Sequence, residues 1–155
     1  MRKESPNSKI WEALSALADN RVEKFSENEY HVTSSDYSKA YTVIAEKDTY
    51  SSNDNATYWQ HYAGYPILAV WMLEKKAEPN AVLLPLFANI PWKALNTKYK
   101  NKYELSIGEA EASFSPENKE KAEAEVARLA SLFTALPLSV KGNRCKILSE
   151  TGKKA

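Results

Sequence analysis

Residues 57–66 form the most unusual stretch of the sequence, because they combine four aromatic residues with one of only two histidines in the chain. Tyrosine hydroxyls can orient a polar ligand while the rings bury it, and histidine titrates near neutral pH. If the stretch is helical, Tyr58, Tyr62 and Tyr65 follow at i, i+4 and i+7 and share one face. The sequence therefore predicts a ligand- or partner-binding surface made of Tyr58, Trp59, His61, Tyr62 and Tyr65. The alternative is that these tyrosines are half-buried packing residues with their hydroxyls at the surface.

A second candidate surface lies in residues 92–103, where four lysines occur without an acidic residue and alternate with tyrosines. Ammonium groups neutralise backbone phosphates, and aromatic rings provide area on which bases stack. This pattern predicts a nucleic-acid-binding helix that uses Lys93, Lys98, Tyr99, Lys100, Lys102 and Tyr103. The alternative is a solvated lysine face that neighbouring glutamates balance.

The sequence lacks the motifs of several kinds of chemistry. Cys145 is the only cysteine, so neither a disulfide within the chain nor a zinc site with cysteine pairs is possible. Four glycines are too few for a P-loop or a dinucleotide fingerprint, and His31 and His61 lack the spacing of paired metal ligands. We therefore assign no catalytic residue, metal ligand or cofactor from the sequence.

The composition is that of a globular protein. The 155 residues are 43% hydrophobic and 26% charged, with a net charge of +1, so no whole-chain charge argues for nucleic acid or membranes. We expect one domain over residues 1–150 and a disordered tail over residues 151–155. The single cysteine, the lack of a signal-peptide pattern and the shortness of the apolar stretch 81–90 predict a cytoplasmic protein without membrane association.

The first half of the chain reads as a helix, a hairpin and a broken helix. Apolar residues recur at helical spacing over residues 7–25, with Glu12 on the polar side. Residues 30–33 and 39–46 predict a β-hairpin, and residues 49–55 a polar loop that can cap the next helix. Residues 56–76 are expected to be helical with a break at Gly64 to Pro66, because proline lacks an amide hydrogen and restricts its neighbour.

The second half reads as mostly helical. Residues 80–88 predict short helical turns, and a helix from Pro91 is expected to carry Trp92 and Tyr103 on one face. Residues 104–114 stay unassigned. Ser115 and Pro116 predict the start of a long amphipathic helix that Pro137 stops, and residues 138–140 and 144–148 are candidate strands. The predicted fold class is α+β, with about five helical pieces packed with a small antiparallel sheet.

Three functions are compatible with these patterns. The first is a non-catalytic binding or protein-interaction module, including self-association, that uses the aromatic-rich surface. The second is nucleic-acid binding through the helix with lysines and tyrosines. The third is a small enzyme centred on His61, with an acid supplied from elsewhere in the fold. The sequence names no ligand, substrate or partner, and leaves open whether the chain is an enzyme.

Overall fold

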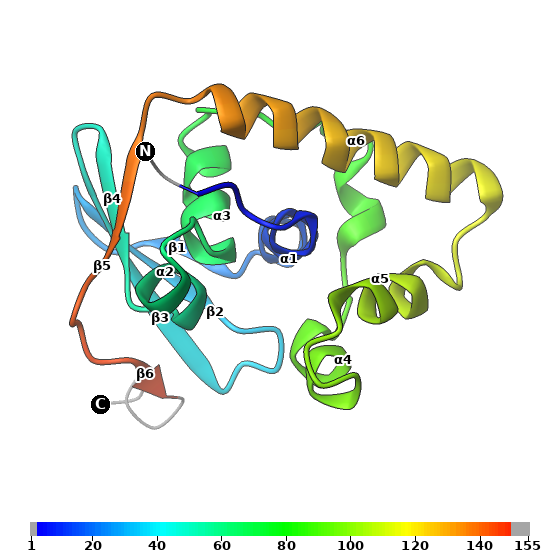
Figure 1. Cartoon of the computed structure of the whole chain (residues 1–155), viewed down its shortest axis with the longest axis horizontal. Helices are drawn as coiled ribbons and strands as arrows, with labels where there is room; N and C mark the ends of the chain where they lie inside the picture. Colours follow the sequence, from blue (N-terminus) through cyan, green and yellow to red (C-terminus); the bar gives the residue numbers. More distant parts are fainter. Residues whose placement is uncertain (1–2, 150–155) are drawn as a thin grey trace.

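The computed structural model describes residues 3–149, so the predicted tail over residues 151–155 lies outside the described residues. Helices and a β-sheet occupy separate parts of the molecule, which makes the fold α+β, as predicted (Figure 1). In chain order the elements are α1 (Asn7–Ala18), β1 (Val22–Lys24), β2 (Glu29–Thr33), β3 (Lys39–Glu46), β4 (Thr49–Ser52), α2 (Asn55–Gln60), α3 (Tyr65–Leu73), the 3-10 helix η1 (Leu84–Phe87), α4 (Trp92–Lys98), α5 (Tyr103–Glu111), α6 (Pro116–Ala135), β5 (Ser139–Gly142) and β6 (Leu148–Ser149).

The sheet has six strands and is larger than the small sheet expected from the sequence. Its order is β1-β2-β3-β4-β5, and β6 pairs with β3 beyond the end of β4. All pairs are antiparallel except β4 with β5, which run parallel because the chain between them passes through α2 to α6. Residues 49–52 were expected in a loop, but they form β4, and Tyr50 of this strand is buried against Trp71.

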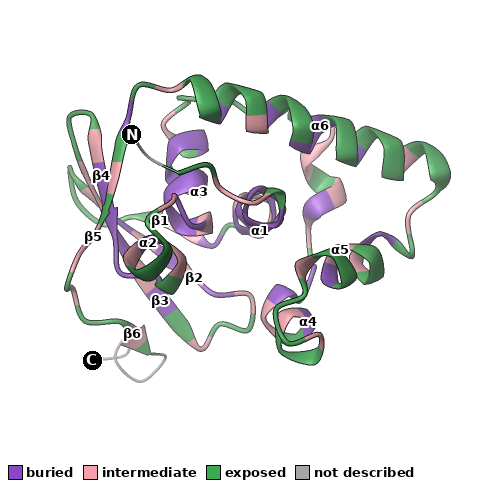
Figure 2. Cartoon of the chain, viewed as in Figure 1, coloured by how far each residue is buried: buried purple, intermediate pink, exposed green. Residues whose placement is uncertain are grey.

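Helix α1 is the centre of the helical part, where it packs against α3, η1, α5 and α6. Nine consecutive residues of α1, from Ser8 to Ala16, are buried. Figure 2 shows α1 and α3 largely buried, whereas the outer side of α6 is exposed. Glu12, which the sequence predicted to lie on a polar, solvent-exposed face, is therefore buried.

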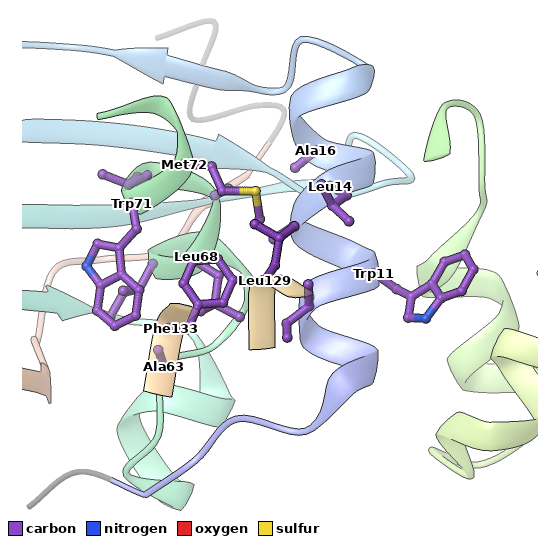
Figure 3. Close-up of a cluster of buried hydrophobic side chains, with 14 of the residues drawn as sticks. Trp11, Leu14, Ala16, Ala63, Leu68, Trp71, Met72, Leu129 and Phe133 are labelled. Carbon is purple, nitrogen blue, oxygen red and sulfur yellow. The ribbon is translucent and has the colours of Figure 1, made fainter. Parts of the chain in front are cut away.

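Two aromatic groups pack on different sides of α1 (Figure 3). Trp71 of α3 contacts Phe133 of α6 with ring centroids 5.8 Å apart. Trp11 contacts Phe87 at 5.1 Å and Trp92 at 6.1 Å. Buried aromatic pairs of this kind contribute beyond the area they bury, so the first pair joins α3 to α6 and the other two join α1 to η1 and α4.

The first helix ends earlier than predicted. It stops at Ala18, and Asn20 adopts a left-handed backbone with φ of 55°. The Arg21 amide then donates to the Ala16 carbonyl at 2.8 Å, which closes the helix end. Residues 22–24, expected at the end of the helix, instead pair with β2.

The predicted break between two helices is present, but it covers residues 61–64 instead of 64–66. Helix α2 ends at Gln60, His61 is left-handed with φ of 63°, and α3 begins at Tyr65 with Pro66 in its first turn. Asp54 caps α2 by accepting a hydrogen bond from the Thr57 amide at 3.1 Å. The predicted start of α6 is confirmed as well, because the Ser115 hydroxyl accepts from the Asn118 amide at 3.1 Å.

The helix predicted from Pro91 is shorter than expected. It ends at Lys98, and Lys100 and Asn101 both have positive φ. A second helix, α5, starts at Tyr103 and covers most of the unassigned stretch. At the C-terminal side, the two candidate strands correspond to β5 over residues 139–142 and to the short β6 over residues 148–149, which pairs with β3.

No helix in residues 3–149 combines the length and the apolar character needed to span a lipid bilayer.

Gly64→Ala is expected to destabilise the protein. A Cβ atom at this position would lie 2.0 Å from Asp54 Oδ2, and the displaced carboxylate is the cap of α2. Overpacking of this kind costs about 1–3 kcal/mol. Urea unfolding monitored by circular dichroism measures the change in the free energy of unfolding.

Gly108→Ala is the matched control, because nothing lies within 4 Å of a Cβ atom built at Gly108 in α5. Alanine is the better helix former, so this variant is expected to gain up to about 1 kcal/mol. Equal stabilities of the two variants would contradict the close approach of Asp54 to Gly64.

Candidate functional site

An open cavity of about 680 Å³ lies among α1, the β2–β3 hairpin, α2, α3 and the α4–α5 segment. These elements meet in the lower central part of Figure 1. The cavity has the size of a small-molecule site, and its lining is rich in charged and aromatic side chains. Such a lining distinguishes it from an apolar packing void.

The wall that α1 contributes carries a buried ion pair. Lys9 is 8% exposed and Glu12 is 6% exposed, and the Lys9 ammonium lies 3.5 Å from Glu12 Oε2. The ammonium also lies 4.5 Å from the centre of the Tyr103 ring, a cation–π distance. Because the rest of α1 is covered by other elements, both charges face the cavity that they line.

Burial perturbs both members of this pair. Burial raises the pKa of Glu12, although Lys9 and a hydrogen bond from Asn96 act in the opposite direction. Burial alone would lower the pKa of Lys9, but Glu12, Tyr103 and Tyr62 more than offset it, so the Lys9 pKa is raised. Lys9 therefore stays protonated at neutral pH, and Glu12 is the group whose charge is costly to maintain.

Arg21 adds a second buried cation to the cavity lining and is only 4% exposed. Its Nη1 donates to the Thr33 carbonyl at 2.6 Å. Its Nε makes no hydrogen bond with any described residue, and Asp19 Oδ2 lies 3.6 Å from it. Nε therefore keeps unused hydrogen-bonding capacity, but it is buried and ion-paired with Asp19.

Asn96 of α4 has unused capacity as well. Its Nδ2 donates to Glu12 Oε2 at the long distance of 3.4 Å. Its Oδ1 is buried and finds no hydrogen-bond partner within residues 3–149. Two residues of the lining, Arg21 and Asn96, therefore each contain a buried polar atom without a hydrogen-bond partner in residues 3–149.

Aromatic residues make up much of the remaining lining. The Tyr41 and Tyr65 rings are perpendicular, with their centres 6.3 Å apart. Burial raises the pKa of Tyr65 well above its usual value and also raises that of Tyr41 and Tyr62, so these hydroxyls stay protonated as neutral donors. The aromatic residues of the lining are Tyr41, Trp59, Tyr62, Tyr65, Trp92 and Tyr103.

The lining carries more positive than negative charge. Four cationic residues line the cavity against two carboxylates, Glu12 and Asp54, and the cations are Lys9, Arg21, Lys39 and Lys93. Asp54 already accepts hydrogen bonds from the Thr57 amide and the Ser52 hydroxyl. Lys39 and Lys93 form no ion pair with a described residue. The excess favours an anionic ligand.

Three of the five predicted aromatic-surface residues line this cavity, namely Trp59, Tyr62 and Tyr65. Tyr58 does not line it but packs against Trp59, with ring centres 4.8 Å apart. His61 is exposed and also lies outside the lining. Because the helix breaks at His61, the expected stripe of Tyr58, Tyr62 and Tyr65 on one helical face does not form.

The residues of the predicted lysine helix separate into two groups. Lys93 and Tyr103 line the cavity. Lys98 and Tyr99 both donate to Glu109 Oε1, at 2.7 and 2.6 Å, and neither lines the cavity. Lys100 and Lys102 are exposed in the bend between α4 and α5.

Sequence reasoning missed the buried residues Lys9, Glu12 and Arg21 and the half-buried Asn96. Nothing in the sequence indicated burial of the first two, because Lys9, Glu12 and Ser15 recur at helical spacing and are typical of a solvent-exposed polar face. Arg21 gave no signal either, because its position depends on the left-handed turn at Asn20.

Lys9→Met is expected to raise the pKa of Glu12 above its already elevated value, because the ammonium 3.5 Å away stabilises the carboxylate. A ¹³C NMR titration of the Glu12 carboxyl carbon, assigned with Glu12→Gln, measures it. Lys98→Met is the control, since Lys98 pairs with Glu109 outside the cavity. A Glu12 pKa that Lys9→Met leaves unchanged would show that the two charges do not interact.

Comparison with known proteins places the chain in a family. The family model described as "Uncharacterised conserved protein UCP014422" matches residues 2–139. No curated protein and no solved structure matches the chain. Since the matched region covers most of the 155 residues, the chain belongs to the family of Uncharacterised conserved protein UCP014422.

Proposed function

We propose that this protein is a non-catalytic binding module, with one domain over residues 1–150, that holds a small anionic ligand in the cavity beside α1. The observation that carries the proposal is the excess of cations in the lining of a cavity of ligand size. Lys9 is paired with Glu12 and Arg21 with Asp19, whereas Lys39 and Lys93 form no ion pair with a described residue. An anion in the cavity would give these two lysines a partner.

The cavity supports a small ligand better than a docked protein. Of the five residues in the predicted aromatic surface, only Trp59 and His61 are exposed, whereas the three tyrosines are half-buried. Two exposed side chains offer little of the buried area that a stable protein interface needs. The concave, charged lining instead suits a molecule that enters it.

The other two hypotheses receive less support from the geometry. A nucleic-acid surface needs its lysines on one face, but the lysine segment is divided between two helices and Lys98 is paired with Glu109. A catalyst centred on His61 needs a pocket around the imidazole, and His61 lies outside the cavity lining. Oligonucleotide binding at low salt would favour the first of these again.

The proposal is tested by a ligand-observed NMR screen with a library of carboxylates, sulfates and phosphates matched to neutral analogues. Anionic compounds are expected to bind in preference to the neutral ones and to raise the melting temperature. Lys9→Gln should weaken binding about tenfold or more, because a hydrogen bond to a charged group is lost.

Lys98→Gln is the matched control, since Lys98 is exposed and ion-paired outside the cavity, and it should bind like the wild type. If Lys9→Gln does not fold, the half-buried Lys93 replaces it as Lys93→Gln. Anions that bind no better than neutral compounds, or that bind both cavity variants as tightly as the wild type, would refute the proposal.

A further inference from the structure

We infer that the anion is a phosphate monoester attached to a planar ring, which is the chemistry of a mononucleotide. This inference rests on the proposed function, and it names the ligand class of the same cavity. Three features of the cavity carry it, namely its charge, the exposed tryptophan at its edge and its size.

The charge of the lining matches a dianion. Two of the four cationic side chains in the lining, Lys39 and Lys93, form no ion pair with a described residue, whereas Lys9 pairs with Glu12 and Arg21 pairs with Asp19. A phosphate monoester carries about −1.5 to −2 charges at neutral pH and offers three acceptor oxygens in a compact group. A single carboxylate would neutralise only one of the two unpaired lysines.

The neutral donors beside these cations fit the same group. Tyr41, Tyr62 and Tyr65 keep their protons, because burial raises the pKa of each. The Ser35 hydroxyl accepts a hydrogen bond from the Lys93 amide at 2.8 Å and keeps its own proton available for a ligand oxygen. The Asp36 carboxylate of the same hairpin accepts from the Ser34 and Ser38 hydroxyls and does not line the cavity.

Trp59 supplies a stacking surface at the edge of the cavity. It lines the cavity and yet is 67% exposed, which is a costly position for the largest apolar side chain. Its ring packs against that of Tyr58, with centres 4.8 Å apart and planes at 73°. Since the contact is edge to face, the Tyr58 ring does not cover both faces of the indole.

Tyr58 is itself held in place by the neighbouring strand. A Cβ atom at Gly142 in β5 would lie 2.5 Å from Tyr58 Cδ1, so the absence of a side chain at Gly142 makes room for this ring. The Tyr58 ring therefore holds Trp59 in its exposed position. A supported, exposed indole next to cationic groups is the arrangement on which nucleobases stack.

The cavity is also too large for an anion alone. Its volume of about 680 Å³ falls within the range of sites for drug-sized ligands. In Figure 1 α2, which carries Trp59, and α4, which carries Lys93, lie on either side of the β2–β3 hairpin loop. A ligand that reaches both elements needs a ring at one end and an anionic group at the other.

The experiment is an isothermal titration of the full chain with nucleoside 5′-monophosphates and with their separate parts. The parts are ribose 5-phosphate, the nucleosides and inorganic phosphate, and succinate serves as a dianion without phosphorus. A mononucleotide is expected to bind at least about tenfold more tightly than ribose 5-phosphate and than the nucleoside, because only it uses both ends of the cavity.

Two pairs of variants test which cavity residue binds the ring of the ligand and which binds its phosphate. Trp59→Leu should weaken mononucleotide binding roughly 5- to 100-fold and leave ribose 5-phosphate unaffected, with Phe25→Leu as the control, because Phe25 is 61% exposed and lies outside the lining. Lys93→Ala should weaken both phosphorylated compounds, with Lys100→Ala as its control, since Lys100 does not line the cavity.

The outcomes separate this inference from the proposed function. If ribose 5-phosphate binds as tightly as the mononucleotides, the inference that the ligand carries a planar ring is wrong. If succinate or other carboxylates bind and phosphates do not, the inference that the anionic group is a phosphate is wrong, while the proposed function stands. If none of the anions binds, the proposed function fails, and the ligand class fails with it.

Discussion

The complete enclosure of α1 is the constraint on which the rest of this structure depends. A helix that is buried along nine consecutive residues must be covered on every side, and α3, η1, α5 and α6 each cover part of it. Two of those nine residues, Lys9 and Glu12, carry charges that cannot be placed in an apolar environment without a partner. The surrounding elements therefore leave a polar space beside them, which tyrosines and Asn96 complete. The cavity is in this sense a consequence of how α1 is packed.

The other cavity residues come from places where regular structure ends. Arg21 follows the left-handed Asn20 after α1, and Tyr62 lies in the gap between α2 and α3. Tyr103 opens α5 directly after the left-handed residues Lys100 and Asn101. Chain ends and bends can direct a side chain away from the periodic faces of a helix or strand, which is how residues distant in sequence reach one cavity.

Local signals predicted the parts of the fold that local chemistry decides. Short-range rules predict a cap for α2 within residues 49–55, Ser115 as the cap of α6, an interruption between α2 and α3 and the amphipathic character of α6. The positions of β1 and β4 do not, because three- and four-residue strands form only when a neighbouring strand supplies their hydrogen bonds. For the same reason, the sequence predicted only some of the residues of the candidate site. Trp59, Tyr62 and Tyr65 stood out by composition, whereas the burial of Glu12 and Arg21 depends on elements far away in the chain.

The enclosure of α1 also bears on how the chain is made. Helix α1 leaves the ribosome long before α6, which spans Pro116–Ala135 and covers one of its sides. At the usual rate of synthesis of about 5–20 residues per second, this delay lasts roughly 5 to 25 s. During that time Ile10, Trp11 and Leu14 lack their final cover, and exposed apolar surface of this kind is what chaperones bind and what drives aggregation. Folding of this protein is therefore a late event, because α1 is translated before the helices that enclose it.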